Sequence, residues 1–238
     1  MNKVCLIRQP CGLGDIILCQ KIAIKIYEKY NIPVIWPVIE EYNYLNSYLD
    51  SNIWFPSINS DFPFKSIYNS KTIIDNDSVL FLPLQDADQL INDKIFKCKY
   101  RMVNLKYDDW KLYVRLKRNF SKEHFLFNNI LNLNKNEKYA LVLKRYGALP
   151  DSKLHPFKYK TNLRVVEVDV LDNFTLFDWS TVIENAEEIY TIDTSIILLI
   201  ELLSLKAKKI GYASRWNNGK DWGEIDYILN VPFEKLYA

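Results

Sequence analysis

The sequence predicts an α/β fold with mostly parallel β-sheets, and two observations lead to this prediction. Short apolar runs of strand length alternate along the 238 residues with segments whose apolar side chains recur at helical spacing. This alternation stops at a polar, turn-forming stretch over residues 132–138 and then starts again. The two series predict two domains, residues 1–134 and 135–238.

The elements of the N-terminal half follow from these patterns in order. The apolar run at residues 4–7 is typical of a short buried strand. Helical spacing over residues 15–30 predicts a helix that ends before Pro33. A second strand is expected at residues 34–36 and a short helix at residues 42–49.

The remainder of the N-terminal half is less regular. Residues 53–76 are rich in Ser, Asn, Pro and aromatic side chains, so we expect an irregular segment with short strands at most. The apolar run at residues 79–82 predicts another buried strand. A long helical stretch is expected over residues 108–133.

The C-terminal half repeats the alternation. Strands are expected at residues 139–143, 163–170, 189–192 and 209–212, and helices at residues 176–186 and 195–205. Parallel strands that alternate with helices build Rossmann-like domains. We therefore expect two small Rossmann-like domains that face a cleft.

Composition and charge narrow the possible partners. The mass of 28.2 kDa is enough for one large core or two small ones, and 49% hydrophobic with 25% charged residues is an ordinary globular balance. A net charge of +2, from 31 basic and 29 acidic residues, gives no reason to expect nucleic acid as a partner. The densest basic stretch, residues 111–122, is interleaved with apolar side chains.

Cysteine usage favours a reducing, cytoplasmic location. The four cysteines form no Cys-x-x-Cys pair and the chain has two histidines, so a zinc cluster is not expected. No histidine and carboxylate that could activate Cys11 as a nucleophile can be identified near it in the sequence. We expect no signal peptide, because the N-terminus has no long apolar run. The longest apolar run, residues 196–205, is too short to span a bilayer.

The run Gly12-Leu13-Gly14-Asp15 lies between the first predicted strand and the first predicted helix. Glycine has no side chain, so the backbone can approach a ligand closely there, and the start of a helix offers unpaired N–H groups to an anion. The run lies at the carboxyl edge of the sheet, where α/β folds bind their ligands. A plain tight turn with Asp15 as the N-cap of the helix is the alternative.

Two nucleotide-binding fingerprints do not fit this run. The dinucleotide pattern needs a third glycine at position 17, where the chain has Ile17. The Walker A pattern fails because no Gly-Lys-Ser/Thr follows. A nicotinamide or flavin site is therefore not expected.

Two further clusters follow predicted strands of the C-terminal half. Lys144 and Arg145 follow its first strand, and such a cation pair can clamp a diphosphate. Asp193, Thr194 and Ser195 begin the last predicted helix, where hydroxyl and N–H groups suit an anion. Ordinary surface charge explains the first cluster equally well, and helix capping explains the second.

The order of these motifs resembles the heptosyltransferase-type glycosyltransferases of family 9, which have the GT-B fold. The run from Arg8 to Leu18, followed by a helix that ends near Tyr30, resembles the N-terminus of that family. Residues 177–186 and 188–195 resemble its donor-side strand and helix, where an Asp-Thr-Gly turn contacts the donor diphosphate.

The resemblance implies transfer of a sugar from a nucleotide-diphosphate sugar to a hydroxyl of a glycan or similar acceptor. The residue that matches Asp15 is the general base for that hydroxyl, and Gly12, Leu13 and Gly14 belong to the acceptor-side loop. No metal or other cofactor is then required.

The resemblance also implies a donor site in the C-terminal half. Lys144 or Arg145 matches the basic residue that neutralises the leaving diphosphate. An acid after the strand at residues 163–170 would bind the nucleotide ribose, and Asp169 is preferred to Asp172. The expected donor-side residues are Lys144, Arg145, Asp169, Asp193, Thr194 and Ser195. His155 is expected as a plain loop residue, with a place in the cleft as the alternative.

The sequence departs from the family at three points. The chain is shorter, so its acceptor-side half would be trimmed. Ser195 replaces the glycine of the donor turn, and Leu198 and Leu199 occupy the place of a following histidine. Two alternatives therefore stay open: a non-catalytic carbohydrate- or nucleotide-binding protein, and a nucleotide-sugar epimerase, which would need further acid and base residues.

Overall fold

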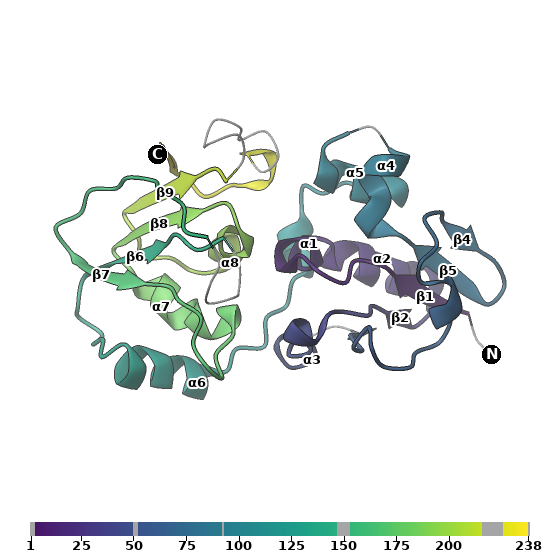
Figure 1. Cartoon of the computed structure of the whole chain (residues 1–238), viewed down its shortest axis with the longest axis horizontal. Coiled ribbons are helices and arrows are strands. Elements are labelled where there is room, and N and C mark those ends of the chain that lie inside the picture. Colours follow the sequence, from purple (N-terminus) through teal and green to yellow (C-terminus); the bar gives the residue numbers. More distant parts are fainter. Residues whose placement is uncertain (1–2, 50–51, 92, 147–152, 216–225, 238) are drawn as a thin grey trace. The chain divides into compact units, whose positions relative to one another are not determined.

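A computed structural model describes residues 3–49, 52–91, 93–146, 153–215 and 226–237 of the chain. The chain divides into two compact units, Met1–Lys117 and Arg118–Ala238. Each unit contains one five-stranded, largely parallel sheet with helices between the strands (Figure 1). The predicted α/β fold class is therefore confirmed.

The sheet of the first unit has β1 at its centre, in the order β3-β2-β1-β5-β4. Its strands are β1 (Val4–Ile7), β2 (Val34–Ile35), β3 (Ile53–Trp54), β4 (Ile74–Asp75) and β5 (Val79–Leu82). Strands β3, β2, β1 and β5 are parallel, and β4 runs antiparallel to β5 at the edge. The alternating sides of β1 place Leu6 in one core cluster with Ile35 and Phe81.

The helices of the first unit are short. They are α1 (Leu13–Leu18), α2 (Gln20–Tyr30), α3 (Leu45–Tyr48), α4 (Ala87–Leu90) and α5 (Ile95–Met102). Single 3-10 turns occupy Glu40–Tyr42, Lys65–Ile67, Leu84–Asp86 and Trp110–Tyr113. The helix predicted over residues 15–30 is interrupted at Cys19, and Asn31 ends it in the left-handed conformation that favours helix termination.

The sheet of the second unit has β8 at its centre, in the order β10-β9-β8-β6-β7, with every pairing parallel. Its strands are β6 (Tyr139–Leu143), β7 (Arg164–Glu167), β8 (Glu188–Ile192), β9 (Lys209–Ala213) and β10 (Glu234–Leu236). The helical elements are α6 (Phe120–Phe125), the π-helical turn η5 (Leu126–Ile130), the 3-10 turn η6 (Leu176–Trp179), α7 (Ser180–Asn185), α8 (Ser195–Leu202) and the 3-10 turn η8 (Asp226–Ile228).

The long helix predicted over residues 108–133 is wrong. Residues 114–119 are not helical. Within them the backbone pairs with the end of α3: Leu116 forms a bridge with Leu49, and the Lys117 amide donates to the Tyr48 carbonyl oxygen at 2.8 Å. Tertiary pairing therefore overrides the local helical pattern here.

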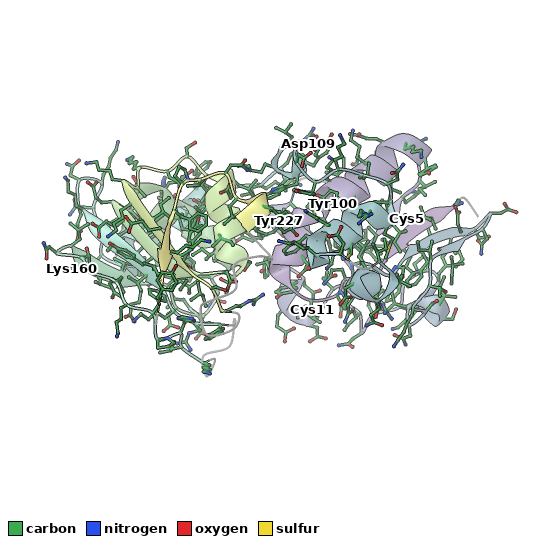
Figure 2. All side chains as sticks on the ribbon, turned by 90° about the horizontal axis from the view of Figure 1, so that it is seen from above. Cys5, Cys11, Tyr100, Asp109, Lys160 and Tyr227 are labelled. Carbon is green, nitrogen blue, oxygen red and sulfur yellow. The ribbon has the colours of Figure 1, made fainter. Side chains whose placement is uncertain are left out.

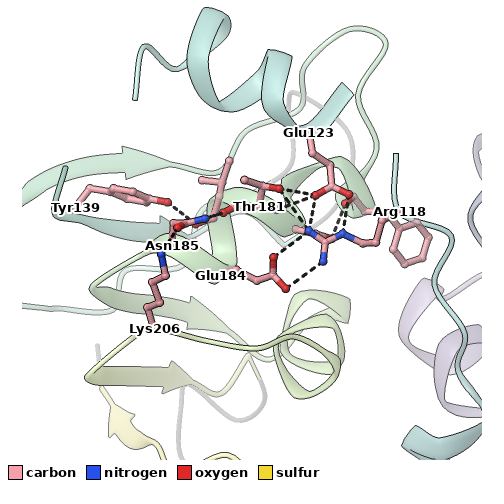
Figure 3. A network of polar contacts seen from close by, with 10 residues as sticks. Arg118, Glu123, Tyr139, Thr181, Glu184, Asn185 and Lys206 are labelled. Carbon is pink, nitrogen blue, oxygen red and sulfur yellow. Dashed lines mark hydrogen bonds and ion pairs between the residues drawn. The ribbon is translucent and has the colours of Figure 1, made fainter. Parts of the chain in front are cut away.

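The boundary between the units lies after Lys117, whereas the polar stretch predicted it after residue 134. Helix α6 belongs to the second unit because a buried network joins it to α7 (Figure 3). Arg118 binds Glu123 at 2.5 Å and Glu184 at 2.9 Å, and the Glu123 carboxylate also accepts from the Thr181 hydroxyl at 2.7 Å. Glu123 is 1% exposed, so this network fixes α6 against α7.

The four cysteines carry free thiols, and Cys5, Cys19 and Cys98 are buried. Within the described parts of the chain, no helix is long and apolar enough to cross a bilayer.

Candidate functional site

The two sheets share one topological feature that bears on where ligands bind. In the first unit the chain moves from β1 to β2 on one side and reaches β5 on the other, so the strand order reverses between β1 and β5. In the second unit the same reversal lies between β6 and β8. Ligands of open α/β sheets bind beyond the carboxyl ends of the strands at such a switch point. The predicted site residues follow β1 in the first unit and β6, β7 and β8 in the second.

Gly12 connects β1 to α1 and has a positive φ of 79°, which a glycine adopts without strain. A Cβ atom at this position would lie 2.6 Å from Oδ2 of Asp15. The space beside the Gly12 backbone is therefore taken by the Asp15 carboxylate. Leu13 and Gly14 are the first two residues of α1.

Asp15 lies in the first turn of α1 but does not cap the helix. The N-cap residue is Gly12, and no side chain makes a capping hydrogen bond there. The Asp15 carboxylate instead pairs with the ammonium of Lys99, which comes from α5 beyond β5. Lys99 is 2% exposed, whereas the Asp15 side chain is 23% exposed. One partner is thus buried and the other reaches the surface.

Gln9 holds the other side of Lys99. Its Oε1 accepts from the Lys99 ammonium at 2.6 Å, and its Nε2 donates to the Cys11 carbonyl oxygen at 2.7 Å. The indole N–H of Trp36 donates to the Gln9 carbonyl oxygen at 2.9 Å. Gln9 therefore joins the loop after β1, the residue after β2 and helix α5 next to Asp15.

Two tyrosines and a further ion pair lie around this loop. Burial raises the pKa of Tyr42, and the nearby Asp15 charge adds to the shift. Arg8 forms a buried pair with Asp86 and donates to the Tyr68 carbonyl oxygen at 3.4 Å.

Two thiols lie near the same loop. The thiol of Cys11 is exposed, and Figure 2 labels this residue. Burial raises the pKa of Cys19 to about 12, so that thiol stays protonated and inert near neutral pH.

In the second unit, Asp193 directly follows the central strand β8. Its Oδ1 accepts from the Arg215 amide at 2.7 Å, and the Arg215 Nε lies 3.7 Å away. Asp193 is 3% exposed, and burial raises its pKa to about 6. Its Oδ2 has no hydrogen-bond partner among the residues that the structure describes.

Thr194 and Ser195 begin α8 and are half-buried. Thr194 is the N-cap residue, but its side chain makes no capping hydrogen bond. Tyr146, after β6, lies close enough to Asp193 for the carboxylate charge to add to the burial that raises the Tyr146 pKa. The ends of β6 and β8 therefore bring Tyr146, Asp193, Thr194 and Ser195 to the switch point.

The two predicted cations after β6 point to different partners. The Lys144 ammonium lies over the rings of Phe157 and Tyr159, 5.1 and 5.2 Å from their centroids. Arg145 forms an ion pair of 2.9 Å with Asp169, which is 53% exposed and follows the neighbouring strand β7. The structure thus brings Arg145 and Asp169 together, and it places Lys144 against an aromatic pair.

His155 is buried rather than a plain exposed loop residue. Its Nδ1 accepts from the Phe157 amide at 3.0 Å, so the proton is assigned to Nε2, which lies 3.1 Å from the Ser214 carbonyl oxygen. Burial lowers the His155 pKa. This neutral ring ties the loop after β6 to the end of β9.

Two charged residues of these sites are not among the predicted ones, Lys99 and Arg215. Lys99 lies in α5, a helix that is not among the predicted elements. Arg215 lies three residues beyond the strand predicted at residues 209–212. Its position at the carboxyl end of a predicted parallel strand could have identified it as a candidate.

Few side chains are placed where they could bind a metal ion together. The Asp-x-Asp spacing occurs twice, at Asp75 and Asp77 and at Asp86 and Asp88. In the structure Asp75 pairs with Lys3 at 2.5 Å, and Asp86 pairs with Arg8. Over the described ranges, no three His, Cys, Asp or Glu side chains gather as a metal site would require.

Comparisons with known proteins show similarity at the level of the fold. No protein-family model matches the chain, and no curated protein matches it in sequence. A glycosyl transferase family 9 structure from Veillonella parvula DSM 2008 is similar to it over 90% of this chain and 82% of that chain, with 9% identity and a TM-score of 0.54. E. coli heptosyltransferase WaaC with ADP matches over 89% of this chain and 86% of that chain, with 12% identity and a TM-score of 0.39. The first likeness shows a shared fold.

Proposed function

We propose that this protein is a GT-B-type glycosyltransferase that transfers a sugar from a nucleotide-diphosphate sugar to a hydroxyl of a glycan or similar acceptor. The observation that carries the proposal is the Asp15 carboxylate, held by Lys99 beyond the end of β1 with its side chain partly exposed. The fold shared with a family 9 glycosyl transferase structure supports the same assignment.

Asp15 serves as the general base in this proposal. Its carboxylate takes the proton of the acceptor hydroxyl while the acceptor oxygen forms a bond to the anomeric carbon of the sugar. The bond between that carbon and the diphosphate oxygen breaks, and the nucleoside diphosphate leaves with the electron pair. A base fixed before the substrate arrives needs no reorganisation during this step.

The second unit binds the donor in this proposal. Negative charge grows on the diphosphate as it leaves, so groups that favour an anion stabilise the transition state. The N–H groups at the start of α8 and the hydroxyls of Thr194 and Ser195 can supply such contacts. Arg145 and Asp169, already paired, are assigned to the diphosphate and the ribose.

Lys144 and Asp193 each need a change of state to serve the donor. The Lys144 ammonium reaches a diphosphate only by leaving the Phe157 and Tyr159 rings. The Asp193 carboxyl binds a phosphate oxygen well only as a protonated donor, since a carboxylate would repel the anion.

A thermal-shift screen tests the donor site. The protein is heated with UDP-, GDP-, ADP- and CMP-sugars, each near millimolar concentration. A ligand that binds the native state raises the melting temperature, so one nucleotide is expected to stabilise the protein more than the others. If none of them shifts the melting temperature, the assignment of a donor site to the second unit is wrong.

A non-catalytic carbohydrate- or nucleotide-binding protein is the second candidate. It is favoured by Ser195, which stands where the resembling family has glycine, and by Leu198 and Leu199, which are buried in α8 where a histidine is expected. A nucleotide that stabilises the protein without any sugar transfer to a panel of hydroxyl acceptors would support this candidate.

A further inference from the structure

We infer that Lys99 is the positioning residue for the general base, because its buried ammonium holds the Asp15 carboxylate in one orientation. The inference rests on the proposed function and adds to it a residue from a different helix.

The burial of Lys99 requires a reason. Its neighbours on α5, Lys97 and Arg101, are half-buried and exposed, whereas Lys99 is 2% exposed. A lysine is almost never fully buried unless its charge is paired. Its ammonium has three N–H donors, and two of them reach Asp15 Oδ1 and Gln9 Oε1. The ammonium is therefore held at one point.

Gln9 makes that point rigid. Because its Nε2 donates to the Cys11 carbonyl oxygen at 2.7 Å, its Oε1 is the atom left to accept from Lys99. Gln9 is itself buried, and the Trp36 indole donates to its carbonyl oxygen. Lys99 therefore donates to Gln9, and Gln9 donates to Cys11, so the orientation of the Gln9 amide is fixed.

Asp15 is confined from the opposite side by the backbone. Its Oδ1 bonds to Lys99, while its Oδ2 occupies the space that a side chain at position 12 would need. Both oxygens therefore have fixed surroundings although the side chain is partly exposed. A carboxylate held in this way presents one geometry to an acceptor hydroxyl.

The charge of Lys99 matters at each turnover. When Asp15 accepts the acceptor proton, the ion pair loses its negative member and the ammonium stays buried beside a neutral carboxyl. The proton must leave for solvent before the ion pair is restored for the next cycle. A lysine that only stabilised the fold would not be affected by the protonation of Asp15 during turnover.

A double-mutant cycle in kcat tests this role. The variants are Lys99→Met, Asp15→Asn and the combination of the two, assayed with the nucleotide sugar that the thermal-shift screen selects. We expect Lys99→Met to lower kcat by about 10–100-fold with the donor KM changed by less than about twofold. In the Asp15→Asn background the same change should lower kcat no further, because Lys99 acts through Asp15.

Two more variants separate charge from orientation. Lys99→Gln removes the charge but keeps a hydrogen-bond donor, so it should recover part of the kcat that Lys99→Met loses. Gln9→Met removes one partner of Lys99 and neither charge, so it should lower kcat less than Lys99→Met. If Lys99→Met does not fold, these two variants carry the same test.

The matched control is Lys21→Met. Lys21 is also a buried lysine of the first unit, paired with Asp109 and bonded to the Lys106 carbonyl oxygen, and the proposal gives it no part in the reaction. Figure 2 labels Asp109. Lys21→Met should lower the melting temperature and leave kcat unchanged.

The outcomes separate the two proposals. Wild-type kcat in Lys99→Met beside an inactive Asp15→Asn overturns the role of Lys99 and leaves the proposed function standing. A further loss of kcat when Lys99→Met is added to Asp15→Asn also overturns it. Full activity in Asp15→Asn, or no transfer by the wild type from any of the four donors, overturns the proposed function and the role of Lys99 with it.

Discussion

Gly12 and Asp15 share one space: a Cβ atom on residue 12 would lie 2.6 Å from the Asp15 Oδ2 atom. The glycine of the loop therefore serves the aspartate three residues later. The left-handed backbone at Gly12, with φ of 79°, adds a second reason for glycine at this position.

Gly12→Ala should harm both stability and activity. The new methyl group meets the Asp15 carboxylate, and alanine is strained at this φ, so the free energy of unfolding should fall by about 1–3 kcal/mol. Displacement of the carboxylate should also lower kcat by at least about tenfold. Urea denaturation and steady-state kinetics measure the two effects. A variant with unchanged stability and kcat would contradict the shared-space account.

The Arg118 network should be a main source of stability in the second unit. Arg118→Met leaves Glu123, which is 1% exposed, without its cation, and breaking a buried pair in this way costs about 3–5 kcal/mol. Urea denaturation measures the loss. The control is Lys25→Met, which breaks the exposed pair between Lys25 and Glu28 and should change stability little. Equal effects from both variants would contradict the structural role of the network.

Asp193 should make the protein less stable as pH rises from about 4 to 6. Burial raises the pKa of this group in the folded state to about 6 from 3.8, so the folded state holds a proton that the unfolded state has lost. Stability is therefore lost as pH rises through this window, by about 3 kcal/mol in total. Asp193→Asn should flatten that part of the pH profile of the unfolding free energy. Asp172→Asn, at an exposed position, should leave it intact.

His155 should act with the opposite sign. Burial lowers its pKa below the ordinary 6.5, so the folded state binds fewer protons than the unfolded state just below that pH. The stability contribution is complete above pH 6.5 and is lost as pH falls below it. His155→Gln should remove this loss, whereas His124→Gln, at the exposed histidine, should retain it. Identical pH profiles for the two variants would contradict the burial of the neutral ring.

The central strands were predictable because their side chains alone specify them. The runs at residues 4–7, 79–82 and 139–143 are apolar throughout, as strands buried on both faces require, and the structure has β1, β5 and β6 at those places. Edge strand β10 could not be predicted, because Glu-Lys-Leu becomes a strand only by pairing with β9.

The candidate sites were predictable only as far as the strand ends. Asp15, Arg145 and Asp193 follow predicted strands, and the pairing of β6 with β7 brings Arg145 beside Asp169. The partner of Asp15 lies 84 positions away in the sequence. Lys99 lies between Lys97 and Arg101, and such a run of cations indicates a solvent-exposed helix face. Its burial depends on how α5 packs, which the sequence does not reveal.

Replacement of the base tests the central claim most directly. The rate of sugar transfer by Asp15→Asn is compared with that of the wild type, using the stabilising nucleotide sugar and an acceptor hydroxyl, after circular dichroism has shown both proteins to be folded. Asparagine cannot take the acceptor proton, so kcat should fall by about 100- to 10,000-fold while the donor still binds. A kcat within about twofold of the wild-type value would contradict the assignment of Asp15 as the general base.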